Sequence, residues 1–395
     1  MKALALGVSL AVATALAGCR TAPVEEARPG ATYRADSDEA GLRFAMDEAE
    51  RRLRASPLRI RDPELEKYIE ELTCRLAGEF CSEIRVYLID LPYANASMAP
   101  NGVLQVWAGL LLRARDEAEI AYVIGHELGH YRHRHVIQLW RSAQRTQALL
   151  GAMQVLTAGV GAALVGGALG LGGAAAINQF SRDHERAADE FGFSTLAQHG
   201  YELNASFGLY EQLAAEEAAL PPRWKSVVFA SHPPTQERLA DMRAAAKSRA
   251  AIEVSQRPEA RGQRYPERYN EIIAPRQAEW IRADLSRRQL GPSRVLLDAL
   301  LKRARPDQQA ELAYFRGEVA RMENNAGSLV EAEGWYRKSI AHRGAPPAAH
   351  RELGLLLRSR GRQAEARAEL ARYLELDPAA EDRALVQHYL AELDS

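Results

Sequence analysis

The run His126-Glu127-Leu128-Gly129-His130 carries the residue types of a hydrolytic metal site. On a helix, residues four apart lie on one face, so the imidazoles of His126 and His130 can reach one zinc ion. Glu127 lies beside them, where a carboxylate can polarise a water held by the metal. The apolar residues just before the run predict a buried helix. A chain with ten histidines can contain this pattern by chance on a solvated helix that binds no metal. A third ligand is therefore needed to distinguish a zinc site from such a helix.

A second polar stretch, which begins at Ser181, offers that ligand. Glu185 can bind zinc, and Asp189, one helical turn later, can accept the N–H of a ligating histidine and fix its tautomer. This Glu-x-x-x-Asp spacing is common in helices, so alone it does not indicate a metal site. It does so only in combination with the first motif. The two motifs predict one zinc ion per chain, with Glu185 as the third ligand.

Three further histidines lie close to these motifs in the sequence. His184 points about 100° away from its neighbour Glu185 on a helix, so we do not expect it to bind the metal. His133 and His135 follow the first motif in a basic turn. We expect these two side chains at the surface or behind the ligands.

The surrounding sequence predicts a mainly α fold with a small β-sheet. Apolar residues recur with helical spacing over residues 41–80, and Asp116 with Glu119 predicts the start of a helix that reaches about Trp140. Residues 84–91 read as a strand, and residues 95–107 as a hairpin with an Asn-Gly turn. Later, the Pro-rich residues 222–235 predict a loop, and the Arg- and Pro-rich residues 251–275 a linker.

Composition narrows the class of protein further. The chain has 395 residues, of which 47% are hydrophobic and 26% charged, as in an ordinary globular protein of two or three domains. Its net charge is 51 − 52 = −1, which gives no global electrostatic reason to bind nucleic acid. Three cysteines are too few for a disulfide scaffold or a cysteine-based zinc ribbon.

The N-terminus predicts export. Lys2 precedes an uncharged apolar stretch, and Leu16-Ala17-Gly18-Cys19 resembles a bacterial lipobox. That resemblance implies removal of residues 1–18, lipidation of Cys19 and, since residue 20 is not Asp, an anchor at the periplasmic face of the outer membrane. Residues 19–40 are then expected to form a flexible tether. The alternative is an ordinary signal peptide with a chance cysteine.

Cys74 and Cys81 remain in the mature chain. On one continuous helix they would lie about 10 Å apart in rise, too far for a disulfide. A disulfide therefore requires the predicted helix over residues 63–77 to end near Gly78, so that the chain turns back. The alternative is two buried thiols.

Residues 146–181 contain no charged side chain and are rich in Gly and Ala. They lie between His130 and Glu185, so one membrane crossing would place two ligands of the same ion on opposite sides of a bilayer. Two crossings would leave too few residues for each leg. We therefore expect a mobile flap over the cleft or at a bilayer surface, with a buried pair of core helices as the alternative.

The C-terminal part is self-similar. Glu331-Ala332 aligns with Glu365-Ala366 at a period of 34 residues, which is typical of tetratricopeptide repeats. Residues 292–395 are accordingly predicted to form an array of helical hairpins that can hold a peptide or a partner, after linker helices over residues 251–291. Generic amphipathic hairpins are the alternative.

Taken together, these motifs resemble peptidase family M48, in its soluble periplasmic branch with tetratricopeptide repeats. The matching residues are Asn95-Ala96, Gly102, Gly109-Leu110, Asp116 to Glu119, His126-Glu127, His130, Arg134-His135, Ser181-Arg182, Glu185, Ala188-Asp189, His232-Pro233 and Arg238. The resemblance covers about residues 41–245, within a metallopeptidase domain expected over residues 41–250, and the repeats extend it to the end of the chain. It implies a gluzincin fold with zinc on His126, His130 and Glu185. It also implies that Glu127 is the general base and that the strand at residues 95–99 binds substrate by β-addition.

This chain differs from the family pattern at two positions, and the resemblance leaves the role of one further residue, His232, undecided. The family often has Glu where this chain has Ala187, and Arg where it has Glu190, but neither position is a ligand. His232 lies in a Pro-flanked stretch that the resemblance brings near the cleft. It is expected to occupy the open zinc position, to donate to the oxyanion, or to have no contact with the site.

The function expected from these features is a zinc-dependent endopeptidase that hydrolyses unfolded or misassembled envelope proteins. The repeats would contact the outer-membrane assembly machinery, and the lipid anchor would hold the chain at the membrane. The alternative function is that of a chaperone or assembly factor, in which binding by the repeats is the main activity and proteolysis is secondary. Because Glu127 and all three ligands are present, we favour the enzyme.

Overall fold

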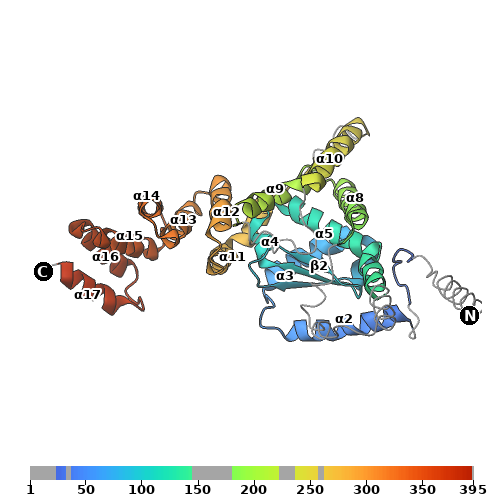
Figure 1. Ribbon diagram of the computed structural model, residues 1–395, viewed down its shortest axis with the longest axis horizontal. Helices are drawn as coiled ribbons and strands as arrows, with labels where there is room; N and C mark the ends of the chain where they lie inside the picture. The colour runs from blue at the N-terminus through green and yellow to red at the C-terminus, as the bar shows by residue number, and fades with distance from the viewer. Residues whose placement is uncertain (1–23, 33–36, 145–179, 222–235, 257–261, 394–395) are drawn as a thin grey trace, which may run out of the picture.

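The computed structural model describes residues 24–32, 37–144, 180–221, 236–256 and 262–393. Within them the chain is mainly helical with one three-stranded sheet, which confirms the predicted fold class at that level (Figure 1). Several predictions fall outside the described residues: the signal peptide 1–18, lipidation of Cys19, nearly all of the 146–181 segment, and His232. None of the described helices is both long and apolar enough to cross a membrane.

The first part of the chain builds the sheet and the helices around it. Its elements are α2 (Asp38–Ala55), α3 (Pro63–Ala77), η1 (Gly78–Glu83), β1 (Arg85–Ile89), β2 (Ala96–Met98), β3 (Val103–Trp107), α4 (Ala108–Arg113), α5 (Glu117–Arg132), α8 (Arg182–Gln198) and α9 (Ala205–Ala218). The strands lie in the order β1-β3-β2, with β1 parallel and β2 antiparallel to β3. The predicted hairpin is therefore confirmed, and β2 lies at an edge of the sheet.

The helix that carries both histidines begins as predicted and ends early. Asp116 caps its first turn by accepting a hydrogen bond from the Glu119 backbone N–H at 3.0 Å. The expectation of one helix to about Trp140 is wrong, because α5 ends at Arg132. Arg134 has a φ of 56°, in the left-handed region that interrupts a right-handed helix, and the chain becomes helical again from residue 135.

Helix α3 ends where the chain must turn. Gly78 has a φ of 56°, which a glycine adopts at little cost, and η1 then carries the chain back toward β1. The turn brings the Cα atoms of Cys74 and Cys81 to 4.6 Å, and the two sulfurs form a disulfide.

We expect protein isolated from an oxidising compartment to contain this disulfide. Alkylation should modify Cys74 and Cys81 only after reduction, as read by peptide mass spectrometry. Replacing both cysteines with serine should lower the free energy of unfolding by about 2 kcal/mol, because the unfolded chain regains the freedom of the closed loop. Two thiols that alkylate in unreduced, folded protein would contradict the disulfide.

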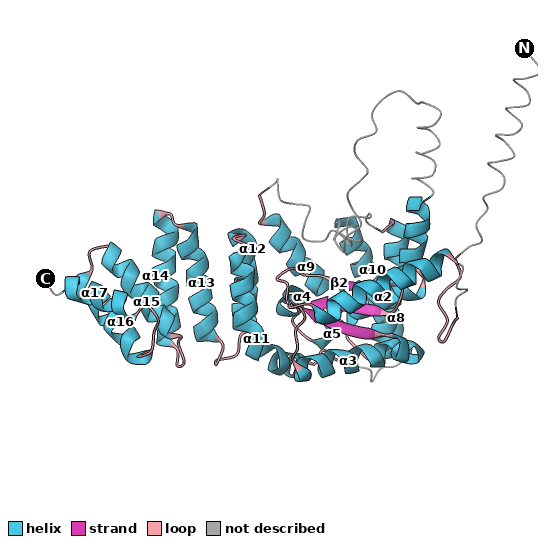
Figure 2. Ribbon diagram, turned by 90° about the horizontal axis from the view of Figure 1, so that it is seen from below, coloured by secondary structure: helices cyan, strands magenta, loops and turns pink. Residues whose placement is uncertain are grey.

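The second part of the chain continues as a row of helices, seen from another side in Figure 2. They are α11 (Pro266–Ser286), α12 (Leu290–Arg303), α13 (Gln309–Glu323), α14 (Ala326–Ala341), α15 (Pro347–Ser359), α16 (Gln363–Leu376) and α17 (Arg383–Leu393). Helix α10 (Gln236–Gln256), which precedes them, packs against α8 and α9 instead. Helix α11 lies within residues 251–291, where we expected linker helices. It is a packed helix rather than a loose connection, since Tyr269, Ile273 and Trp280 are buried.

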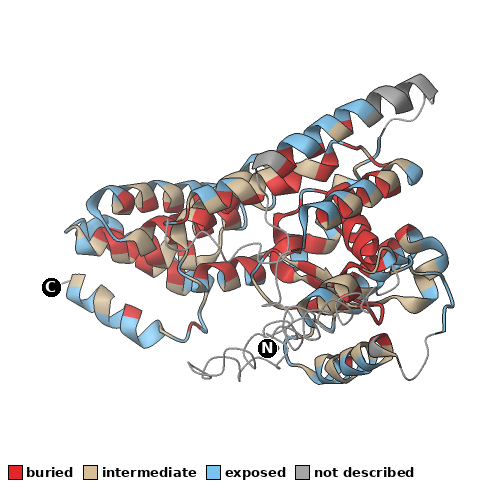
Figure 3. Cartoon of the chain, turned by 45° about the vertical axis from the view of Figure 1, so that its right-hand side comes forward, coloured by how far each residue is buried: buried red, intermediate tan, exposed pale blue. Residues whose placement is uncertain are grey.

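One hydrophobic core joins the two parts. It includes Leu104 of β3 and Ile124 of α5, and it continues without a break to Trp280 of α11, Leu297 of α12 and Phe315 of α13. Figure 3 shows buried residues running from the sheet into the row of helices. Smaller separate clusters fill the hairpins farther along the row.

Candidate metal centre

Helices α5 and α8 approach each other closely because small residues line their contact. A Cβ atom on Gly129 would lie 3.0 Å from the Ala188 Cα, and one on Gly192 would lie 2.9 Å from the ring of Tyr122. Larger residues at either position would push the two helices apart. This close contact allows polar side chains from both helices to meet.

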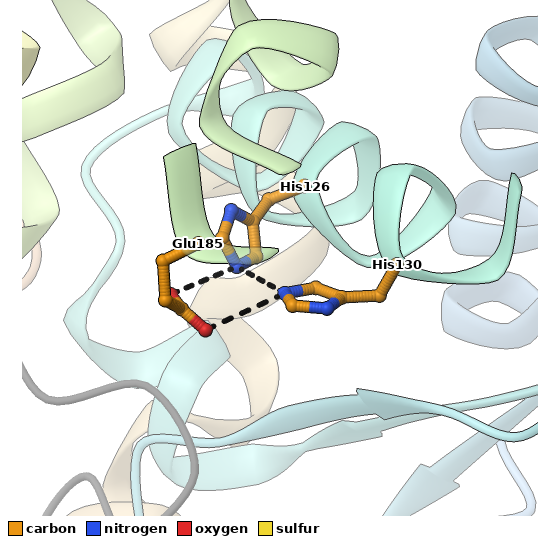
Figure 4. Close-up of side chains that lie close together, drawn as sticks. All are labelled: His126, His130 and Glu185. Carbon is orange, nitrogen blue, oxygen red and sulfur yellow. Dashed lines mark hydrogen bonds and ion pairs between the residues drawn. The ribbon is translucent and has the colours of Figure 1, made fainter. Parts of the chain in front are cut away.

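The three predicted ligands converge across this contact, as Figure 4 shows. The Nε2 atoms of His126 and His130 lie 3.1 Å apart, and each lies 3.6 Å from an oxygen of Glu185. Each of the three residues offers one donor atom, and these atoms lie within 4.8 Å of one another. All three side chains are buried, so the group could hold one metal ion out of bulk water.

The donor set fits zinc. Two imidazole nitrogens and one carboxylate oxygen are typical ligands of a hydrolytic zinc ion, which keeps a fourth position open. Calcium and magnesium prefer shells made of oxygen, so two imidazoles argue against them. Glu127 is also buried, on α5 between the two histidines, where the sequence places it beside the ligands.

Asp189 holds His126 in place from the side away from Glu185. Its Oδ1 atom lies 2.9 Å from the Nδ1 of His126 and accepts a hydrogen bond from the hydroxyl of Tyr122 at 2.8 Å. Burial alone would raise the pKa of Asp189, but the contacts with His126 and Arg238 outweigh burial and hold that pKa well below its usual range. Asp189 therefore remains a carboxylate that can fix the His126 tautomer, with Nε2 turned toward Glu185.

Arg238 of α10 connects the carboxylates of the site. Its guanidinium donates to both oxygens of Asp189, at 2.7 and 3.0 Å, and lies 2.6 Å from Glu185 Oε2. The same group lies over the ring of Tyr210, 5.0 Å from its centroid. Arg238 is one of the residues that match the pattern of family M48, but the sequence alone indicated no role for it. Only its place five residues after a His-Pro pair could have marked it.

The neighbouring histidines form a stack behind the ligands. The Nδ1 atom of His135 lies 3.0 Å from the Nδ1 of His130, and its ring stacks on His184 with centroids 4.3 Å apart. Burial, followed by the nearby His184 and His133, lowers the pKa of His135 to about 3. In this arrangement neither His135 nor His184 joins the three donors, although His135 contacts one of them directly.

Comparison with known proteins gives the site its context. The sequence model described as Peptidase family M48 matches residues 59–246, which include all the residues described above. The chain carries a peptidase family M48 domain. This result confirms the resemblance, and the M48 domain extends from just before α3 into α10.

Curated relatives of the M48 domain are named as proteases. A putative beta-barrel assembly-enhancing protease of Vibrio cholerae is 31% identical over 214 residues, which are 50% of this chain and 42% of that protein. Metalloprotease YcaL of Escherichia coli is 35% identical over 150 residues, 38% of this chain and 57% of that protein. The beta-barrel assembly-enhancing protease of Escherichia coli is 28% identical over 204 residues, 49% and 41% of the two chains. The chain thus spans about half the length of these relatives.

Asp189→Asn should weaken the metal site without removing a ligand. Asparagine has nearly the same shape but no charge, so it would leave Arg238 without its bidentate partner and His126 more weakly oriented. We expect zinc affinity to fall by about 10- to 100-fold, measured by competition with a chelating dye. Asp183→Asn is the matched control, because Asp183 lies on the same helix with its side chain 91% exposed. Equal affinities for the two variants would contradict this role of Asp189.

Proposed function

We propose that this chain is a zinc-dependent endopeptidase that acts on unfolded or misassembled proteins of the bacterial envelope. The observation that carries the proposal is the meeting of His126, His130 and Glu185 in a buried group, with Glu127 on the same helix as the two histidines. Three ligands with an open position and an adjacent carboxylate are the elements that metal-assisted peptide hydrolysis requires.

Each residue has a defined role in this proposal. When bound, zinc supplies Lewis-acid polarisation of the scissile carbonyl and of water. Glu127 takes a proton from the attacking water and later passes it to the leaving amine. Asp189 and Arg238 keep His126 and Glu185 in position, so that the ligands need not reorganise during the reaction.

Substrate binding and location are part of the same proposal. Among the described strands, β2 pairs only with β3, so its other edge can accept an extended polypeptide. The lipobox at Cys19 supports an outer-membrane lipoprotein that faces the periplasm. The names of the relatives, which refer to β-barrel assembly, support envelope proteins as substrates.

A second candidate function rests on the helical row. The aligned positions Ala332 and Ala366 are fully buried in α14 and α16. Gly317 packs against Tyr336, and Gly354 against Leu370, at corresponding places in two successive hairpins. These correspondences support tetratricopeptide-like repeats that would bind the outer-membrane assembly machinery, in which case the chain acts as an assembly factor and cleavage is secondary.

The central experiment combines metal content with cleavage. The purified chain should contain one zinc ion and cleave an unfolded outer-membrane protein, and a chelator should abolish cleavage until zinc is restored. Glu185→Ala should lose zinc, as should alanine at either histidine. Full zinc in Glu185→Ala would contradict this ligand, and cleavage that survives complete metal removal would contradict the mechanism.

His232 is assigned two alternative roles, as a plug on the open zinc position or as a donor to the oxyanion. A plug predicts that His232→Ala accelerates proteolysis. An oxyanion donor predicts a decrease of about a hundredfold or more. An unchanged rate with unchanged zinc affinity would leave His232 without a role in the site.

A further inference from the structure

The segment of residues 24–32, which precedes α2, lies against the end of the metal-binding helix. The backbone N–H of Ala27 donates to the carbonyl of Arg132 at 2.7 Å, and the guanidinium of Arg134 donates to the carbonyl of Glu25 at 3.2 Å. Arg132 is the last residue of α5 and Arg134 lies in the turn after it, so both bonds are made just after His130 in the sequence. The backbone of this N-terminal segment is thus fixed on both sides of Glu26.

Charged side chains hold the N-terminal segment at two further places. The carboxylate of Glu26 lies 3.2 Å from the Nε of Arg132 and 3.0 Å from the Nδ1 of His133. The backbone N–H of Gly30 donates to Glu83 at 2.6 Å, and Glu83 also accepts a hydrogen bond from the hydroxyl of Tyr131 at 2.8 Å. The segment therefore spans from the end of α5 to the end of η1.

This position places Ala27 in the same small recess as one of the three donor residues. Ala27 is half-buried and lines a small recess together with Met98, Ala99 and Pro100, at the end of β2. The metal ligand His130 lines the same recess. The recess thus lies between the end of the edge strand and His130, on the side of the strand where the side chain of a polypeptide laid along β2 would reach it.

We propose that the N-terminal segment forms one wall of a substrate subsite, and that Ala27 sets the size of the side chain which that subsite accepts. This inference rests on the proposed function, because it takes β2 as the strand that binds substrate. The recess is small, and Ala27 contributes only a methyl group to its wall beside larger neighbours such as Met98 and Tyr131, so the subsite selects small side chains next to the scissile bond. One added or removed methylene in such a site changes selectivity by about 10- to 200-fold.

The test compares two substitutions with opposite expected effects. Ala27→Gly retains the backbone hydrogen bonds and enlarges the recess, so the preference should shift toward larger side chains. Ala27→Leu fills the recess, so kcat/KM should fall by at least about tenfold for peptides whose flanking residue is Ala or Ser, which the native recess accepts, and least for Gly. Ala31→Leu is the control, because Ala31 is exposed in the same segment. Cleavage sites in one unfolded protein and in a peptide series are mapped by mass spectrometry.

A second readout separates this proposal from the proposed function. The same peptides are titrated against the Glu127→Gln chain, with and without each substitution at residue 27, and binding is followed by fluorescence anisotropy. If the peptide affinities change both with residue 27 and with the size of the peptide side chain, they support the proposal that Ala27 lines a substrate subsite, even if the chain cleaves none of the peptides. Identical cleavage sites and identical affinities for Ala27→Gly, Ala27→Leu and the native chain would overturn it.

Discussion

Glu127→Gln is expected to reduce the cleavage rate by about 10²- to 10⁴-fold while the chain retains its full zinc content. Glutamine fills nearly the same buried volume as glutamate but cannot accept a proton at neutral pH. The three donors from His126, His130 and Glu185 remain, so metal binding should not depend on Glu127. Single-turnover cleavage of a fluorogenic peptide measures the rate, and atomic absorption measures the zinc.

Glu71→Gln provides the matched control, because Glu71 lies on α3 with its side chain 56% exposed. It should leave both rate and zinc unchanged. In cells, the Glu127→Gln variant also separates the two candidate functions. Lost envelope function indicates a protease, whereas retained function indicates a scaffold. A purified Glu127→Gln chain that cleaves at the native rate would show that another group is the base.

Arg113→Met should lower the free energy of unfolding by about 3 to 5 kcal/mol. Arg113 is 2% exposed, and its guanidinium lies 2.8 Å from Glu216 of α9 and 2.7 Å from Asp284 of α11. Removal of the cation leaves two buried carboxylates without their main partner. Burial raises the pKa of Glu216, and removal of Arg113 should raise it further. Urea unfolding followed by circular dichroism measures the loss.

Arg305→Met is the control for this prediction. Arg305 pairs with Asp307, but the two side chains are 40% and 66% exposed, and such surface pairs contribute at most about 1 kcal/mol. Adding Glu216→Gln and Asp284→Asn to Arg113→Met should recover part of the lost stability, since neutral amides are less costly to bury than carboxylates. A loss below about 1 kcal/mol for Arg113→Met would contradict this account of the buried cluster.

The sequence revealed features that depend on residues near one another in the chain. Helical spacing and an N-cap predicted the helix that carries His126 and His130, and alternation with a turn signal predicted the hairpin at β2 and β3. The end of α5 was missed, because a left-handed Arg134 has no distinctive signal in a basic, helix-compatible run.

Contacts between distant residues could not be predicted in this way. Arg238 lies 49 residues after Asp189, and Arg113 lies 171 residues before Asp284, so neither pair is visible as spacing. The stacking of His135 on His184 depends on how the helical stretch that begins at residue 135 packs against α8. Such contacts arise from packing, which periodicity does not describe.

The shared hydrophobic core has a practical consequence for anyone dividing this chain into pieces. A cut in the stretch near residue 260, which looks like a domain boundary in the sequence, would separate α5 from Trp280, Leu297 and Phe315. Both fragments would then expose apolar surface that the intact chain buries, and both would be prone to aggregate. A cut that spares this core must lie beyond α13, so a fragment that keeps the metal centre on its full core needs at least the beginning of the helical row.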